Sequence, residues 1–204
     1  QMRHRDSAGH EGNLIAGSVQ WMTAGRGIIH SEMPQQEDGL MWGFQLWVNL
    51  PAAEKMCSPR YQDIPPDQIP WLTQENGTRI GVVAGRVGQA VGPVSGVAVD
   101  PLYLDVRVLA ETEVQIALPE DHHGFVYVYE GSGSWGATQL DAGSLGVLGP
   151  GKSLQAQAGE AGVRFLVVTG RPIGEPIARH GPFVMNTRQE LAQAVTDFQN
   201  GVLA

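Results

Sequence analysis

The sequence contains a single cysteine, Cys57, and carries few charged residues, with a net charge of −8 over 204 residues. A lone thiol cannot form a disulfide within the chain and fits a reducing compartment, so we expect a cytoplasmic protein. No apolar run approaches the roughly 20 residues that cross a bilayer, and we expect no membrane association. No run of lysine and arginine offsets the acidic balance, which argues against direct binding to nucleic acid.

Glycine, by contrast, is abundant. The chain includes 27 glycines and 13 prolines, spread without a fixed period. Glycine and proline residues distributed in this way favour short strands joined by tight turns over long helices. β-Forming runs separated by roughly eight to twenty residues predict an all-β protein, a sandwich or a barrel. The expected strands are residues 1–5, 19–23, 28–33, 43–50, 79–84, 102–109, 113–118, 125–129, 144–148 and 163–169.

Residues 51–71 interrupt this pattern. Prolines stand at positions 51, 59, 65, 66 and 70, and few apolar residues are consecutive. Because proline lacks the backbone donor of a strand ladder, we expect a linker or an extended crossover rather than a strand. The predicted organisation is one domain over residues 1–64, a linker over 65–72 and a second domain over 73–204.

A short helix is expected within the second domain, over residues 188–199. Thr187 can cap its first turn, with Glu190 as the reciprocal partner of a capping box. Asn200 and Gly201 provide a stop signal. Four apolar residues fall on one face at helical spacing. They are Leu191, Ala194, Val195 and Phe198.

His30 and Glu32 are the residues best suited to bind a metal. One residue separates them in an expected strand, so their side chains point to the same face. An imidazole beside a carboxylate suits iron, manganese, nickel or zinc. A mononuclear iron centre needs about three or four protein ligands, however, and spacing alone leaves open that the pair is an ordinary polar rim.

The other histidines are weaker candidates. His4 lies in an expected strand, where a hydrogen-bonding role is favoured over ligation, and His10 lies in a polar turn. His122 and His123 are adjacent, so in a strand they would point to opposite faces, and a turn is the preferred interpretation. His180 precedes a glycine and a proline, and we expect it to order the local backbone.

Four aromatic residues leave two interpretations open: they line a pocket for a planar substrate, or they fill the interior of a barrel. They are Trp21, Trp42, Phe44 and Trp47. Cys57 has no neighbouring histidine, which argues against a catalytic thiol.

Several motifs together resemble the signature of the pirin family. They are DSAGH over residues 6–10, VQWMTAGRGIIHSEMP over 19–34, LWVNLP over 46–51, PRYQ over 59–62 and HGPFVMNT over 180–187. Because the motifs follow one another along the whole chain, the resemblance is specific.

The resemblance implies two cupin β-barrel domains of jelly-roll type in tandem, with a short C-terminal helix. In pirins the first cupin binds one metal through three histidines and a glutamate, and the second usually lacks metal. His30 and Glu32 match two of these ligands. The other two are expected in a His-x-His stretch upstream of Gln1, so these 204 residues are expected to hold metal weakly. Fe(II) is the expected metal, with nickel, manganese, copper and zinc as alternatives.

The resemblance also implies a function. The primary hypothesis is a metal-dependent dioxygenase of the quercetin 2,3-dioxygenase type that opens the ring of a flavonol, a small planar phenol. Glu32 would be both ligand and acceptor of the substrate proton. The alternative is an iron-binding regulatory protein that binds a transcription factor or a metabolic enzyme without turnover. In either case we expect a monomer.

Overall fold

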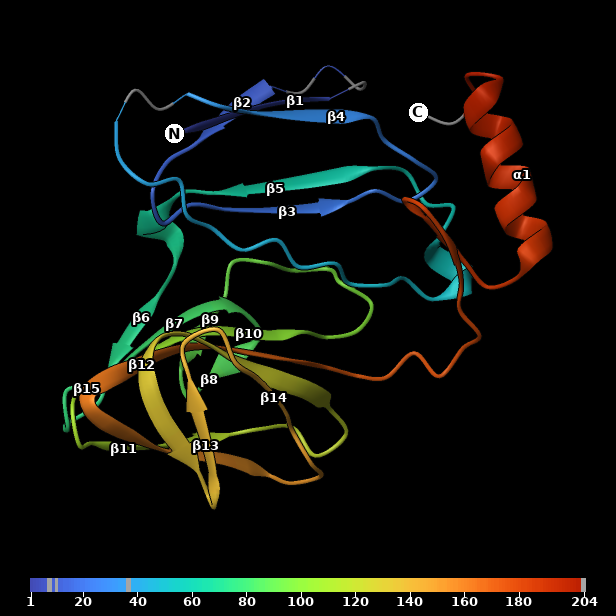
Figure 1. Cartoon of the computed structure of the whole chain (residues 1–204). Coiled ribbons are helices and arrows are strands. Elements are labelled where there is room, and N and C mark those ends of the chain that lie inside the picture. The colour runs from blue at the N-terminus through green and yellow to red at the C-terminus, as the bar shows by residue number, and fades with distance from the viewer. Residues whose placement is uncertain (7–8, 10, 36–37, 203–204) are drawn as a thin grey trace. The chain divides into compact units, whose positions relative to one another are not determined.

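The chain folds into two compact units, formed by residues 1–66 with 173–204 and by residues 67–172. The computed structural model describes residues 1–6, 9, 11–35 and 38–202. Strands make up most of the regular structure, and one α-helix lies near the C-terminal end of the described residues (Figure 1). The prediction of a mainly β protein with a short C-terminal helix is therefore confirmed.

The first unit is built from small antiparallel sheets. One sheet has the strand order β2-β1-β4, a second pairs β3 with β5, and a third pairs β16 with β17. Their bounds are β1 (Met2–Asp6), β2 (Glu11–Leu14), β3 (Val19–Thr23), β4 (His30–Pro34), β5 (Arg60–Ile64), β16 (Ala178–His180) and β17 (Phe183–Met185). Two short 3-10 helices flank β5, namely η1 (Ala52–Glu54) and η2 (Pro66–Gln68), and α1 (Arg188–Gln199) follows β17.

The second unit is one eight-stranded sheet with a small hairpin. The sheet has the order β13-β12-β15-β10-β7-β6, with β11 paired to β15 and β14 paired to β12, and β8 pairs with β9 in the hairpin. The bounds are β6 (Trp71–Thr73), β7 (Arg79–Ala84), β8 (Arg86–Val87), β9 (Ala90–Val91), β10 (Leu102–Val108), β11 (Glu113–Ala117), β12 (His123–Trp135), β13 (Thr138–Asp141), β14 (Leu145–Val147) and β15 (Ser153–Gly170).

The large apolar core lies in this second unit. Strand β10 alternates between buried and half-buried residues, which places Leu104 and Val106 on its inner face. Phe165 and Val167 of the neighbouring β15 are also fully buried. Trp135 packs edge-on against Phe165, with 5.1 Å between the ring centroids. Apolar side chains thus fill the interior of the unit.

Strands β12 and β15 are longer than the runs expected over 125–129 and 163–169. Gly131 has a φ of +73°, and a Cβ on it would come within 2.1 Å of the Gly162 carbonyl oxygen. The β12–β15 register shifts at this point. Glycine here lets the two strands bend while they continue, instead of ending them.

Part of the expected linker is a strand, so the prediction of no strand over 51–71 is wrong. Strand β5 pairs with β3 from Val19 opposite Ile64 to Thr23 opposite Arg60. The prolines at 59 and 65 lie just outside β5. Because they flank the strand, every ladder donor within it is retained.

Residues 43–50 were expected to form a strand, and in the described structure they do not, so this prediction is wrong. Their apolar and polar residues alternate, as in a strand. Alternation is local, however, and a strand also needs a neighbouring segment that accepts and donates its ladder hydrogen bonds.

The C-terminal segment groups with the first unit rather than with β15, which precedes it in the chain. The Ala52 N–H donates to Glu175 Oε2 at 2.7 Å, and Lys55 Nζ donates to the Val184 carbonyl at 3.2 Å. The compact units thus differ from the predicted second domain over 73–204, because contacts between distant residues decide where the last segment packs.

The bounds and the cap of α1 agree with the prediction. Thr187 Oγ1 accepts from the Glu190 N–H at 3.2 Å, and Glu190 Oε2 accepts from the Thr187 N–H at 2.8 Å. The Thr187 hydroxyl also donates to Glu190 Oε2 at 3.0 Å, and this bond, followed by that from the Thr187 N–H, lowers the pKa of Glu190. Among the described residues, no helix is long and apolar enough to cross a membrane.

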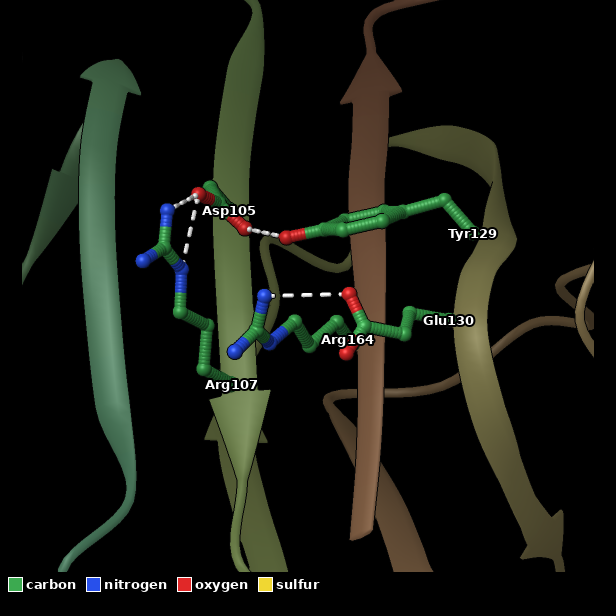
Figure 2. A network of polar contacts seen from close by, with 5 residues as sticks. All are labelled: Asp105, Arg107, Tyr129, Glu130 and Arg164. Carbon is green, nitrogen blue, oxygen red and sulfur yellow. Dashed lines mark hydrogen bonds and ion pairs between the residues drawn. The ribbon is translucent and has the colours of Figure 1, made fainter. Parts of the chain in front are cut away.

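A polar network lies on the outer face of the second unit's sheet, and Figure 2 shows Asp105 at its centre. Asp105 accepts from Arg107 Nη2 at 2.8 Å and from the Tyr129 hydroxyl at 2.6 Å. Trp71 lies beneath the Arg107 guanidinium, 4.5 Å from ring centroid to Cζ. Burial, and then the hydrogen bond to Asp105, raise the pKa of Tyr129. Burial raises the pKa of Tyr103 to about 12.

These tyrosines predict an alkaline loss of stability. The folded protein holds both phenolic protons to a higher pH than the unfolded chain, whose tyrosines titrate near about 10. Stability that is fully present below pH ~10 is therefore lost as the pH rises through the folded-state pKa values. Tyr129→Phe should lower the free energy of unfolding at pH 7 by about 1 to 3 kcal/mol and flatten its fall between pH 10 and 12. Urea unfolding across this range measures both effects, and an unchanged slope would contradict the assignment.

A matched pair of leucines tests the position of the core. Leu104→Ala should lower the free energy of unfolding by about 2 to 5 kcal/mol, because the residue is fully buried and a cavity remains. Leu145→Ala, the control, changes a leucine of the same unit that is 52% exposed. It should cost less than about 1 kcal/mol in the same urea titration. Equal losses of unfolding free energy in the two variants would show that Leu104 does not belong to the buried core.

Candidate metal centre

The proposed ligands lie on β4, the exposed edge strand of the sheet β2-β1-β4. His30 and Glu32 are two residues apart in this strand, so both side chains point to one face, as the sequence predicted. All five residues of β4 are exposed. The two donors therefore stand on an open surface of the first unit and not in a packed interior.

Glycine shapes the turn that leads into β4. Gly25 has a φ of +54°, and a Cβ on it would come within 2.2 Å of the Cys57 carbonyl oxygen. The same carbonyl accepts from the Arg26 N–H at 2.9 Å. Only glycine tolerates both the backbone conformation and this close approach, so the turn fixes the start of the ligand strand.

His30 is oriented by a methionine of β3. Its Nδ1 atom lies 3.1 Å from Met22 Sδ. A thioether sulfur can only accept, so this contact favours the tautomer with the proton on Nδ1. That tautomer leaves the Nε2 lone pair available to bind a metal.

His4 lies directly opposite Glu32 in the β1–β4 pair and opposite Gly12 in the β1–β2 pair. It is only 4% exposed. Its Nε2 atom lies 3.7 Å from Asp63 Oδ1 of β5, which also accepts from Gln20 Nε2 at 2.9 Å. The contacts from His4 and His30 join the sheet β2-β1-β4 to the pair β3-β5, which form two layers in Figure 1.

The chemical types of these donors suit a divalent transition metal, but two donors are too few to complete a site. The Glu32 carboxylate makes no hydrogen bond or ion pair with the described residues, and the His30 contact leaves one ring nitrogen open. Two donors make up only part of the three or four that an iron site needs. No group of three or more His, Cys, Asp or Glu residues in the described part of the chain is arranged to hold a metal ion.

Of the remaining histidines, His122, His123 and His180 lie outside β4. His10 is outside the described residues. His122 precedes β12, with Nδ1 3.0 Å from Thr169 Oγ1, and burial lowers its pKa. His123 begins β12 and is exposed, and His180 ends β16. Within the described part of the chain, none of these histidines belongs to a group of three or more possible metal ligands.

The aromatic residues do not fill a barrel interior. Trp42, Phe44 and Trp47 are 58%, 45% and 59% exposed, and Trp21 is half-buried. Trp42 and Phe44 lie side by side, with 6.1 Å between ring centroids. Trp47 lies beneath the Arg179 guanidinium. Their role in binding a planar substrate stays a prediction.

An open groove lies between β16 and the first turns of α1. Its volume is about 420 Å³, and Ile177, Arg179, Arg188 and Leu191 are among the residues that line it. Neither His30 nor Glu32 contributes to it. The groove is therefore separate from the candidate metal centre.

Comparison with known families matches this chain to two family models. The model of the pirin C-terminal cupin domain matches residues 103–204, and the pirin model matches residues 1–48. A pirin-like protein of Caulobacter vibrioides is 46% identical over 203 residues, which cover 98% of this chain and 73% of that protein. Pirin-1 of Arabidopsis thaliana is 40% identical over 203 residues, which cover 97% of this chain and 69% of that protein.

Solved structures give the same result. The crystal structure of a quercetin 2,3-dioxygenase from Acinetobacter baumannii is 34% identical and superimposes with a TM-score of 0.90. The match covers 100% of this chain and 72% of that one. The family resemblance seen in the sequence motifs is thus confirmed.

The number of donors predicts weak metal retention by these 204 residues. After loading with Fe(II) or Ni(II) and gel filtration with a chelator, we expect far less than one metal per chain, because two donors provide little chelate stabilisation. Elemental analysis by mass spectrometry measures the ratio. Stoichiometric retention would contradict this and would require further donors within these residues.

Proposed function

This chain belongs to the pirin family, and we propose that it acts as a metal-dependent dioxygenase of the quercetin 2,3-dioxygenase type on a flavonol-like phenol. The observation that carries the proposal is the pair of donors, His30 and Glu32, on one open face of β4. The structural likeness to a quercetin 2,3-dioxygenase along the whole chain supports it.

His30 and Glu32 would hold the metal, His30 through Nε2 and Glu32 through its carboxylate. Two donors are fewer than the three or four of a mononuclear iron site, so further donors would be needed to complete the set. Fe(II) suits this mixture of imidazole and carboxylate, as do nickel, manganese, copper and zinc. A bound divalent metal would supply Lewis acidity and open positions for substrate and dioxygen.

The role of Glu32 follows from its surroundings. The exposed Glu32 carboxylate would also be the group that accepts a proton from the hydroxyl of a phenolic substrate. The phenol proton then resides on Glu32, and the substrate becomes the more electron-rich phenolate. His30 keeps its orientation meanwhile, since Met22 holds its other ring nitrogen.

The second unit has a supporting role in this proposal. Its interior is filled by apolar side chains such as Leu104, Val106 and Phe165, which offer no donor to a metal. We therefore place the chemistry in the first unit. A regulatory function without turnover is the second hypothesis, and the following assay separates the two.

Oxygen consumption with quercetin tests the proposal. The full-length, Fe(II)-loaded protein should consume dioxygen as quercetin disappears. His30→Ala should abolish metal binding and turnover, and Glu32→Gln should slow turnover by about 100- to 10,000-fold because it cannot take a proton. Oxygen-electrode and absorbance measurements report the rates.

Two variants in the second unit serve as controls. His123→Ala and Glu160→Gln change exposed residues of the same types on β12 and β15 and should leave the rate unchanged. A loaded protein that consumes no oxygen with quercetin or related flavonols would favour the regulatory hypothesis. Full activity in Glu32→Gln would remove the proposed proton acceptor.

A further inference from the structure

His4 is a buried histidine that the proposed chemistry does not use, and we propose that it is the positioning residue for the Glu32 carboxylate. The inference rests on the proposed function, because it assumes that Glu32 binds the metal. His4 is 4% exposed, whereas the whole of β4 is exposed. A fixed, buried ring thus stands beside a ligand on an otherwise open strand.

The strand register brings the two side chains together. His4 of β1 is the direct antiparallel partner of Glu32 of β4, so both point to the same face. Directly opposed residues have Cβ atoms about 4.5 to 5.5 Å apart, which is within reach of a ring and a carboxylate chain. The imidazole therefore limits the directions in which the Glu32 side chain can extend.

Residues from three other strands hold the ring in place. Gly12 of β2 lies under it, because a Cβ at Gly12 would come within 2.3 Å of His4 Nε2. Asp63 of β5 faces Nε2 at 3.7 Å, and Gln20 of β3 holds Asp63 by a 2.9 Å hydrogen bond. The imidazole cannot retreat from Glu32 without displacing one of these neighbours.

The same contacts argue for positioning rather than ligation. His4 Nε2 faces Asp63, and His4 is only 4% exposed, whereas His30 and Glu32 are exposed. A residue that restricts a ligand before the metal arrives lowers the conformational entropy lost on binding. Such supporting residues typically change metal affinity by about 10- to 100-fold.

Binding of Co(II) to the full-length protein tests the proposal, because its visible absorption reports ligand geometry. His4→Ala, Asp63→Asn and Gly12→Ala should each lower Co(II) affinity by about 10- to 100-fold and alter the absorption bands. Gly12→Ala acts by pushing the ring aside, since its backbone is not in the left-handed region. His4→Gln, which can still bond to Asp63, should recover part of the affinity.

Two controls and a stability measurement isolate the effect. Arg3→Ala changes the neighbouring residue on the opposite face of β1, and Gly43→Ala adds a methyl group where no atom lies within 4 Å. Both should leave affinity and absorption unchanged. Thermal unfolding of the metal-free variants should not follow the same order as the Co(II) affinities.

Three results would overturn the inference. If His4→Ala changes only the KM for the phenol, His4 contacts substrate instead. If the variants lose stability while the affinity and spectrum of bound Co(II) stay unchanged, its role is structural. If His30→Ala and Glu32→Ala abolish Co(II) binding while His4→Ala binds Co(II) normally, the positioning role of His4 is wrong and the proposed metal site is supported. Normal binding by His30→Ala and Glu32→Ala would instead remove the proposed site itself.

Discussion

The antiparallel pairing of β1 with β4 is the constraint on which the candidate site depends. Its register sets His4 opposite Glu32, and alternation along β4 then places His30 on the same face. A slip of one residue would turn both donors to the other face and bring Ser31 and Met33 in their place. A hydroxyl and a thioether are poorer ligands for a divalent metal than a carboxylate and an imidazole. The chemistry proposed for the first unit therefore depends on strand register.

Under the proposed function, the two units divide stability and chemistry between them. In the second unit, fully buried residues such as Leu104 and Phe165 form an apolar core, and polar groups such as Asp105 stay on the outer face, where each has partners. The first unit instead displays uncompensated donors on an open strand. Burying a carboxylate such as Glu32 without a partner would be costly, so a metal site of this kind needs a surface that stays accessible until its ligands are complete.

Local signals in the sequence were reliable, and signals that needed a distant partner were not. The capping box of Thr187 and Glu190 predicted α1 because all its hydrogen bonds form within one turn. The sequence pattern predicted a strand over residues 43–50 and a linker where β5 lies. Both predictions were wrong because a local pattern does not show which distant segment pairs with a strand. Contacts such as that of Lys55 with Val184 group the C-terminal segment with the first compact unit, a grouping that no local pattern indicates.

For the candidate site, the sequence by itself determined that His30 and Glu32 share a face, because alternation along a strand needs no knowledge of its neighbours. It also identified the family through motifs spread along the chain. Only the tertiary structure decided that His4, Gly12 and Asp63 meet beside Glu32, because each comes from a different strand. Their convergence depends on pairings between residues far apart in the chain, and no local pattern encodes those pairings.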